Sequence, residues 1–515
     1  MKANRAFVCG KSREVDSGIV FNRVTARGGG KHGARRRCRA VALALVLQSL
    51  ILYGALPALA QSEKPVEVKR PELQIGNAVR YDEDWSTLKG VDTSRTDDFW
   101  DRLKFIPFTT DQSVWLSIGG QVRERFEYFD QFQWGASAPK RSDAYLAQRI
   151  RLNTDLHVTP YFRLFFEGWS ALVWDRDLQG GNSTTFVDQA DLHNGFAEVM
   201  IPLRDQASVT LRGGRQELIF GAQRLVGVSD FTNTRRSFDG ATSIVRVGDW
   251  TITPFWADLM VVKQYRFNTS STDNQLFGIY STGPAHLLPG NLDLYYLGVD
   301  NKTAAFNGTS GREKRHTLGL RAWGKIGQNW DFEFEGAGQF GTLGSGDIGA
   351  GMVAAILGYT LPVKDLSPRV YLEFDYGSGD KKPGGKVGTF NQLYPSSHGF
   401  LGYNDFIGWQ NILSPSAGVS LKPVRDLTVS LQQYLFWRAS DRDAIYNSGG
   451  AVQRPGTGTR ARYVGAETDL LATYNFTRHL QGYAGYSFIS SGGFIEKTGR
   501  DSNSNFVYTA LQYTF

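Results

Sequence analysis

Apolar and polar residues alternate with a period of two from about Val114 to the last residue of the chain. In the segment IGGQVRERFEYF, residues 118–129, Arg123 and Arg125 share one face, whereas Val122 and Phe126 share the other. The same alternation returns in segments 145–158, 161–169, 331–336 and 371–377. Because successive side chains of a strand point to opposite sides, each segment has one apolar face and one charged face.

This alternation fits a soluble sandwich as well as a membrane barrel, so other features have to separate the two. Three features favour the barrel. The segments recur between glycine-rich turns, aromatic residues gather toward their ends, and the final NFVYTALQYTF resembles the assembly signal of bacterial outer-membrane barrels. At about 22 residues per strand with its connection, the chain suffices for on the order of 18 strands. We therefore predict an all-β fold, a transmembrane antiparallel outer-membrane β-barrel of about 18 strands with a water-filled lumen.

The charged faces are expected to line that lumen, because an arginine facing lipid at mid-membrane costs about 2–4 kcal/mol. Glu124 interrupts the apolar face of segment 118–129. A β-bulge at this point, or a position outside the hydrocarbon, would account for it.

The N-terminal part of the chain has a different character. Basic residues 35–39 precede the apolar run 41–56 and the Ala58-Leu59-Ala60 motif, which together predict a secretory signal peptide over residues 1–60. A membrane anchor is the alternative, but 16 residues interrupted by Gln48 fall short of the roughly 20 that a helix needs. The long segment before this run leaves a translation start downstream of Met1 open. Residues 61–112 are polar and proline-punctuated, and they predict a periplasmic N-terminal extension with short helices before the transmembrane barrel, residues 113–515.

Charge and cysteine content exclude several classes of protein. The formal net charge is +7, but the first 40 residues hold eleven Lys or Arg against Glu14 and Asp16, a local +9. The remainder is near −2, so the basic balance belongs to the leader and gives no support to nucleic-acid binding. Both cysteines, Cys9 and Cys38, also lie in the leader. The chain from Gln61 therefore has no disulfide and no cysteine chemistry.

Enzyme signatures are weak. The segments 336–341 and 344–349 both match G-x-G-x-x-G, but neither opens a helix in a βαβ unit. Neither G-x-S-x-G nor H-E-x-x-H occurs, and the histidines are too scattered to suggest a metal site. We predict no catalytic residue, cofactor or metal, which disfavours an outer-membrane lipase or protease.

Four stretches carry a resemblance that covers essentially the whole chain after the leader. RYDEDWSTL (80–88), IGGQVRERFEYF (118–129), GRQELIFGAQRLVG (214–227) and FNQLYPSSHGFLGYNDFIGWQNI (390–412) are similar to the alginate export family of outer-membrane proteins. The resemblance implies a monomeric barrel of 18 strands, whose arginine-rich constriction passes an anionic uronic-acid polymer out of the cell. It also implies that Arg215, Arg123 and Arg125 lie at this constriction.

Guanidinium groups match carboxylates in charge and shape, so an arginine-lined lumen suits an acidic sugar. Acidic residues between the arginines would hold them in place and keep binding weak enough for release. The candidate pore-lining residues are Arg123, Arg125, Arg149, Arg151, Arg163, Glu167, Glu198, Arg215, Arg224, Glu467 and Asp469. The same charges could instead only brace neighbouring strands.

The expected function is an outer-membrane channel for an anionic polysaccharide, most simply in export. A diffusion porin for small anionic or sugar nutrients is the alternative, because it would need the same arginines. The expected partners are the acidic polymer or sugar, outer-membrane lipid and lipopolysaccharide, the barrel assembly machinery and a periplasmic delivery protein, but no nucleic acid.

Overall fold

The computed structural model describes residues 66–76, 78–204, 206–396 and 398–515. The signal peptide predicted at residues 1–60 lies outside the described residues.

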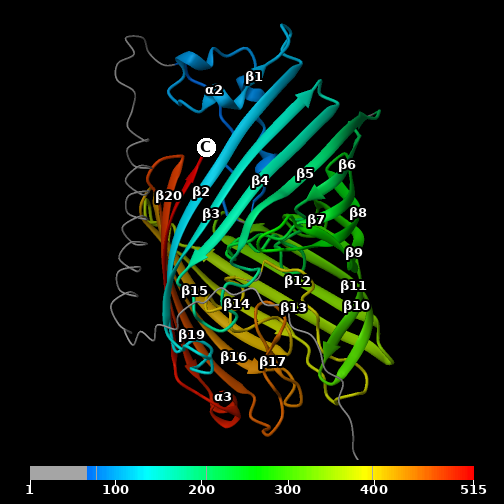
Figure 1. Cartoon of the computed structure of the whole chain (residues 1–515), viewed down its shortest axis with the longest axis vertical. Coiled ribbons are helices and arrows are strands. Elements are labelled where there is room, and N and C mark those ends of the chain that lie inside the picture. The colour runs from blue at the N-terminus through cyan, green and yellow to red at the C-terminus, as the bar shows by residue number, and fades with distance from the viewer. Residues whose placement is uncertain (1–65, 77, 205, 397) are drawn as a thin grey trace, which may run out of the picture. The chain divides into compact units, whose positions relative to one another are not determined.

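Eighteen antiparallel strands form a closed barrel, which confirms the predicted fold and strand number (Figure 1). Each strand pairs with its neighbours along the chain, and the pairing of the first strand, β2, with the last, β21, closes the sheet. The strands are β2 (Val114–Asp130), β3 (Asp143–Val158), β4 (Phe162–Trp174), β5 (Asp188–Pro202), β6 (Ser208–Gln216), β7 (Phe238–Val247), β8 (Trp250–Val261), β9 (Thr269–Pro284), β10 (Asn291–Phe306), β11 (Thr309–Ile326), β12 (Trp330–Leu343), β13 (Gly346–Thr360), β14 (Arg369–Gly377), β15 (Ile412–Val424), β16 (Leu427–Arg438), β19 (Tyr463–Asn475), β20 (Leu480–Ser491) and β21 (Ser504–Thr514).

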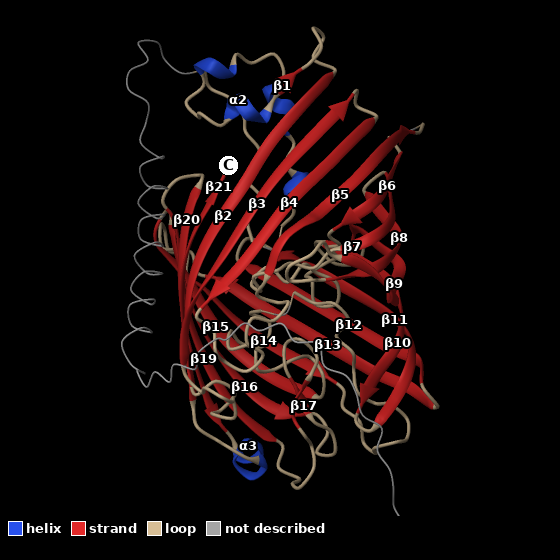
Figure 2. Ribbon diagram, in the orientation of Figure 1, coloured by secondary structure: helices blue, strands red, loops and turns tan. Residues whose placement is uncertain are grey.

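The two ends of the barrel differ in the length of their connections (Figure 2). At the end near Val114 and Phe515, here called the short-turn end, segments such as 159–161, 248–249 and 425–426 join the strands. At the other end, the long-loop end, the connections include 131–142, 175–187, 217–237, 378–411 and 439–462. The last of these contains the hairpin β17 (Ile445–Tyr446) and β18 (Val452–Arg454), and the connection 492–503 contains helix α3 (Gly493–Thr498).

The outside of the barrel is apolar, as the alternation predicts. Phe126, Leu152 and Leu211 are between 40% and 56% exposed, and the residues before and after each of them are buried inside. This is the surface that a barrel presents to lipid.

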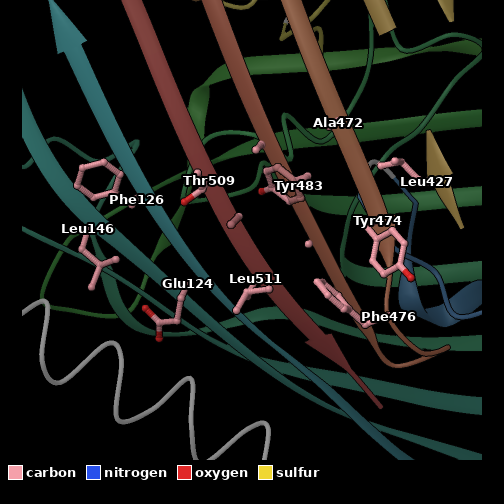
Figure 3. Close-up of a pocket in the computed structure, with 13 residues that line it drawn as sticks. Glu124, Phe126, Leu146, Leu427, Ala472, Tyr474, Phe476, Tyr483, Thr509 and Leu511 are labelled. Atoms are coloured by element: carbon pink, nitrogen blue, oxygen red, sulfur yellow. The ribbon is translucent and has the colours of Figure 1, made fainter. Parts of the chain in front are cut away.

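Glu124 remains on this outer face, where it lines a groove of about 370 Å³ with Phe126, Leu146 and Leu511 (Figure 3). The pairing of β2 with both neighbours is continuous through Glu124, so the predicted bulge is wrong. Its carboxylate instead accepts a hydrogen bond from Gln148, the residue directly opposite on β3. This partner satisfies one carboxylate oxygen within the apolar face.

The extension before the barrel packs against the short-turn end. It contains three 3₁₀ turns, η1 (Arg80–Asp82), η2 (Trp85–Leu88) and η3 (Thr93–Arg95), then helix α2 (Asp101–Lys104) and the two-residue strand β1 (Ile106–Pro107), which pairs with β2. Trp100 stacks on the C-terminal Phe515 at 4.1 Å between ring centroids. No helix among the described residues is long and apolar enough to cross a bilayer.

Long loops fold back into the lumen and supply much of the buried apolar core. Leu218 and Val226 of loop 217–237, and Phe390 and Trp409 of loop 378–411, pack in one cluster with inward side chains of the wall. The two loops also pair with each other, because Gly227 N–H donates to Tyr394 O at 2.8 Å. The lumen is therefore an obstructed passage, and loop 217–237 lies at its centre.

Candidate functional site

Five inward-facing arginines on strands β2, β3 and β4 form a basic wall, and each of them binds an acidic partner. Arg125 binds Glu127, and Arg151 donates twice to Glu167, each time at 3.1 Å. Arg163 binds Asp155 at 2.7 Å and Glu198 at 3.2 Å. Arg123 and Arg149, the other two, reach the loop in front of them. Period-two alternation puts these side chains on one face, and cross-strand register puts the acids beside them.

Loop 217–237 is held across the lumen by one charged residue at each side. On the basic wall, the Asp230 carboxylate lies 2.7 Å from Arg149, 2.7 Å from Arg235 and 3.6 Å from Arg123. Burial disfavours its ionisation, but the three guanidiniums outweigh burial and hold the pKa of Asp230 well below its ordinary value. On the opposite wall, Arg224 binds Glu335 at 3.0 Å and also Glu333. The loop is thus fixed by its own Asp230, which binds arginines of the basic wall, and by its own Arg224, which binds glutamates of β12.

The wall formed by strands β10 to β19 is acidic. Its inward side chains include Asp293, Glu333, Glu335, Glu373, Asp375, Glu467 and Asp469. We expected Glu467 and Asp469 to hold arginines, and this is wrong. Glu467 accepts a hydrogen bond from Asn404 N–H at 2.8 Å, and Asp469 accepts one from Tyr403 N–H at 3.2 Å. Loop 378–411 covers β19, so its backbone N–H groups are the donors beside these two acids. Glu167 and Glu198 do bind arginines.

Along the lumen, the described residues enclose a larger and a smaller cavity. The larger, about 670 Å³, is at the long-loop end and is lined by residues that include Arg125, Arg235 and His193. The smaller, about 310 Å³, lies between the extension, the start of loop 217–237 and strands β6 to β9, and Glu217 lines it. Glu217 accepts from Arg235 at 2.6 Å and lies 2.8 Å from His193. Since these bonded residues border different cavities, the group Asp230, Arg235, Glu217 and His193, here called the Arg235 cluster, separates them.

The extension enters the lumen and narrows the passage on the short-turn side of this cluster. Arg235 donates to the carbonyl oxygens of Gly76 and, at 2.9 Å, Ala78, and Arg163 donates to Tyr81 O at 2.6 Å. The Tyr81 ring packs edge-on against Phe165 and Phe196, and its hydroxyl donates to Glu217 O at 2.8 Å. We call residues 78–83 the lumen segment.

Arg215 does not join this cluster. It pairs in register with Asp239 and lies four residues along β6 from the outward Leu211. Its guanidinium binds Asp239 at 2.9 Å and Asp191 at 3.2 Å, where β6 and β7 end, and it lines neither of the two cavities. Asp230, Arg235, Glu217 and His193 take the central place instead. Glu217, Asp230 and Arg235 lie in an irregular loop, where no periodicity marks an inward position, and His193 lies beside that loop on β5.

Within the part of the chain that the structure describes, no three His, Cys, Asp or Glu side chains are arranged to hold a metal ion. What the site can do is recognise charge: it presents guanidiniums to a passage whose other side carries carboxylates.

The family model described as Alginate export matches residues 114–509. Curated protein sequences give no match. The chain is similar in fold to crystal structures of Acinetobacter baumannii OccAB2 (TM-score 0.51, 12% identity, 77% of this chain and 98% of that chain), and of Pseudomonas aeruginosa OprD (0.50, 12%, 78% and 93%) and OccK2 (OpdF) in complex with glucuronate (0.50, 11%, 78% and 96%).

Proposed function

Since the chain belongs to the alginate export family, it is an outer-membrane channel, and we propose that it passes an anionic polysaccharide, a uronate polymer similar to alginate, out of the cell. Short turns of such barrels face the periplasm and long loops face the exterior. The polymer would then enter at the short-turn end, beside the lumen segment, and leave through the larger cavity.

The observation that carries the proposal is the grouping of three guanidiniums around the single carboxylate of Asp230. Arg123, Arg149 and Arg235 already bind one carboxylate beside the boundary between the two cavities. A uronate carboxylate has the same chemistry, so it can take the place of Asp230 without a new kind of contact.

Exchange of partners also explains how such a polymer could keep moving. The arginines of the basic wall are neutralised by acids, so an incoming carboxylate replaces a bond and does not add one. Binding at each step stays weak, and several such steps follow along the wall, as conduction of a charged chain requires.

A diffusion porin for small carboxylates or sugars is the second candidate, and the lumen segment favours the first. A porin for small solutes needs a passage that is wide at rest, whereas residues 78–83 occupy part of this one beside Arg163, Arg235 and Glu217. A passage that is narrowed at rest suits a channel that opens fully only when a polymer is delivered.

Currents across planar bilayers test the proposal. We expect the opened channel to prefer anions in a salt gradient and to be blocked by long uronate oligomers from the short-turn side at lower concentration than by monomeric glucuronate. Arg123→Gln should weaken the anion preference, and Arg215→Gln, which removes an arginine outside both cavities, should leave it nearly unchanged. Block by monomers alone would favour the porin.

A further inference from the structure

The four arginines that line the larger cavity fall into two kinds. Arg125 and Arg235 bind the carboxylates of Glu127 and of Glu217 and Asp230. Arg176 and Arg236 form no ion pair with any residue in the described ranges, and their hydrogen bonds go to backbone carbonyl oxygens. A carbonyl is a dipole that orients a guanidinium but leaves its charge uncompensated.

Arg176 is fixed by its own loop. Its two terminal nitrogens donate to Gly181 O and Gln179 O, and its guanidinium lies 4.1 Å from the centre of the Phe186 ring. The residue is 8% exposed, and its Nε has no hydrogen-bond partner among the residues that the structure describes. A buried donor without a partner costs free energy that a bound acceptor would recover.

Arg236 joins the two loops that fill the lumen. Its Nη1 donates to Gly227 O at 2.9 Å, Tyr394 O at 2.7 Å and Pro395 O at 3.0 Å. Its Nε and Nη2 form no hydrogen bond with a described residue, so the edge of the guanidinium that carries these two nitrogens remains available. This edge can bind a carboxylate while Nη1 keeps its carbonyl partners.

The rest of the lining suits a carbohydrate. The partly buried rings of Phe132 and Phe186 give apolar surface for the C–H side of a sugar, and Asn447 and Gln453 give amides for its hydroxyls. A volume of about 670 Å³ lies within the usual range of small-molecule sites. Of the lining acids, Glu127 is bound to Arg125 and Asp405 lies 2.9 Å from His398, so neither neutralises Arg176 or Arg236.

We propose that this cavity is a binding subsite for a short stretch of uronate sugar, in which Arg176 and Arg236 recognise carboxylates. The inference rests on the proposed function and deepens it. Arg123, Arg149 and Arg235 bind Asp230 of loop 217–237 deeper in the lumen, whereas Arg176 and Arg236 select the anionic sugar at the outer exit.

Binding of a galacturonate trisaccharide to the detergent-purified channel, measured by calorimetry against neutral maltotriose, tests the subsite. We expect Arg176→Gln and Arg236→Gln each to weaken trisaccharide binding about tenfold or more, because a charged hydrogen bond is lost, with little effect on maltotriose. Arg176→Lys should restore part of the affinity. Arg460→Gln, which changes an exposed arginine of the loop 439–462, is the matched control and should bind as the parent does. Equal loss of both sugars, or no loss, would overturn the proposal.

A second measurement does not depend on those variants folding correctly. With Cys9 and Cys38 replaced by Ser, Ser448→Cys places the chain's single thiol on the cavity wall. The trisaccharide should slow labelling of this thiol by a maleimide, and maltotriose should slow it less. Absence of protection would rule out the subsite even if the current is anion-selective and blocked by long oligomers. Protection without such block would retain the subsite and refute polymer transport.

Discussion

The lumen segment gives the strongest prediction: weakening its attachment should open the channel. Tyr81 is the residue to change, because its ring packs against Phe165 and Phe196 with centroids 5.6 and 5.1 Å away and lies 4.4 Å from the Arg212 guanidinium. It is 6% exposed. When the segment leaves the lumen, the ring enters water, so replacing it removes stabilisation from the docked state only.

The expected size follows from burial. Removing a buried aromatic ring costs about 3–5 kcal/mol, so Tyr81→Ala should raise the population with the segment released by about a hundredfold or more. Tyr81→Phe keeps the ring and loses the hydroxyl bond to Glu217 O, which is worth about 1 kcal/mol, or roughly fivefold. Tyr161→Ala, in an exposed turn at the same end, is the control and should change little.

Two assays follow the released state. Single-channel recordings give the frequency of opening. Trypsin cleavage after Arg80 gives the released population, because Arg80 is 3% exposed and donates to Phe515 O at 2.6 Å when docked. The cleavage rate is normalised to that of the same variant unfolded in urea. If cleavage rises in the order parent, Phe, Ala while the current stays constant, the lumen segment does not close the passage. If neither the cleavage rate nor the opening frequency changes, the contacts of Tyr81 do not hold the lumen segment in place.

Three further predictions concern charge. Burial, and next the nearby Arg80, lower the pKa of Lys104 from its ordinary 10.5 to about 7, so the docked extension favours the neutral lysine. Docking of the extension is therefore strongest above about pH 10. Its equilibrium constant falls by up to tenfold per pH unit between about pH 10 and pH 7, and it falls no further below pH 7. The opening frequency should therefore be higher at pH 7 than at pH 9, and Lys104→Met should flatten this profile; a profile unchanged by Lys104→Met would assign it to another group. Arg151→Ala should destabilise the barrel by about 3–5 kcal/mol, because it leaves Glu167 buried and unpaired. The double variant Arg151→Met with Glu167→Leu should have nearly the stability of the parent. The urea midpoints of the two variants and the parent measure this difference. On the outer face, Glu124→Leu with Gln148→Leu should raise the urea midpoint in lipid vesicles, and a lower midpoint would show that this polar pair stabilises the barrel.

The sequence by itself determined the barrel. Alternation assigns Arg123, Arg149 and Arg163 to the lumen and Phe126 and Leu152 to the outside, because side chains of a strand alternate strictly and lipid accepts only apolar groups. Alternation depends only on neighbouring residues of one strand, so it can be read from the sequence without knowledge of distant contacts.

Only the tertiary structure decided what the arginines do. Loop 217–237 has no period, and its place depends on partners far away along the chain: Asp230 on Arg149, Arg224 on Glu335 and Arg235 on Ala78. Arg215, in one of the four stretches similar to the alginate export family, lies outside both cavities, whereas Arg176, in the connection 175–187, lines the larger one. Charged side chains take the nearest partner in space, and closure of the barrel sets which partners are near.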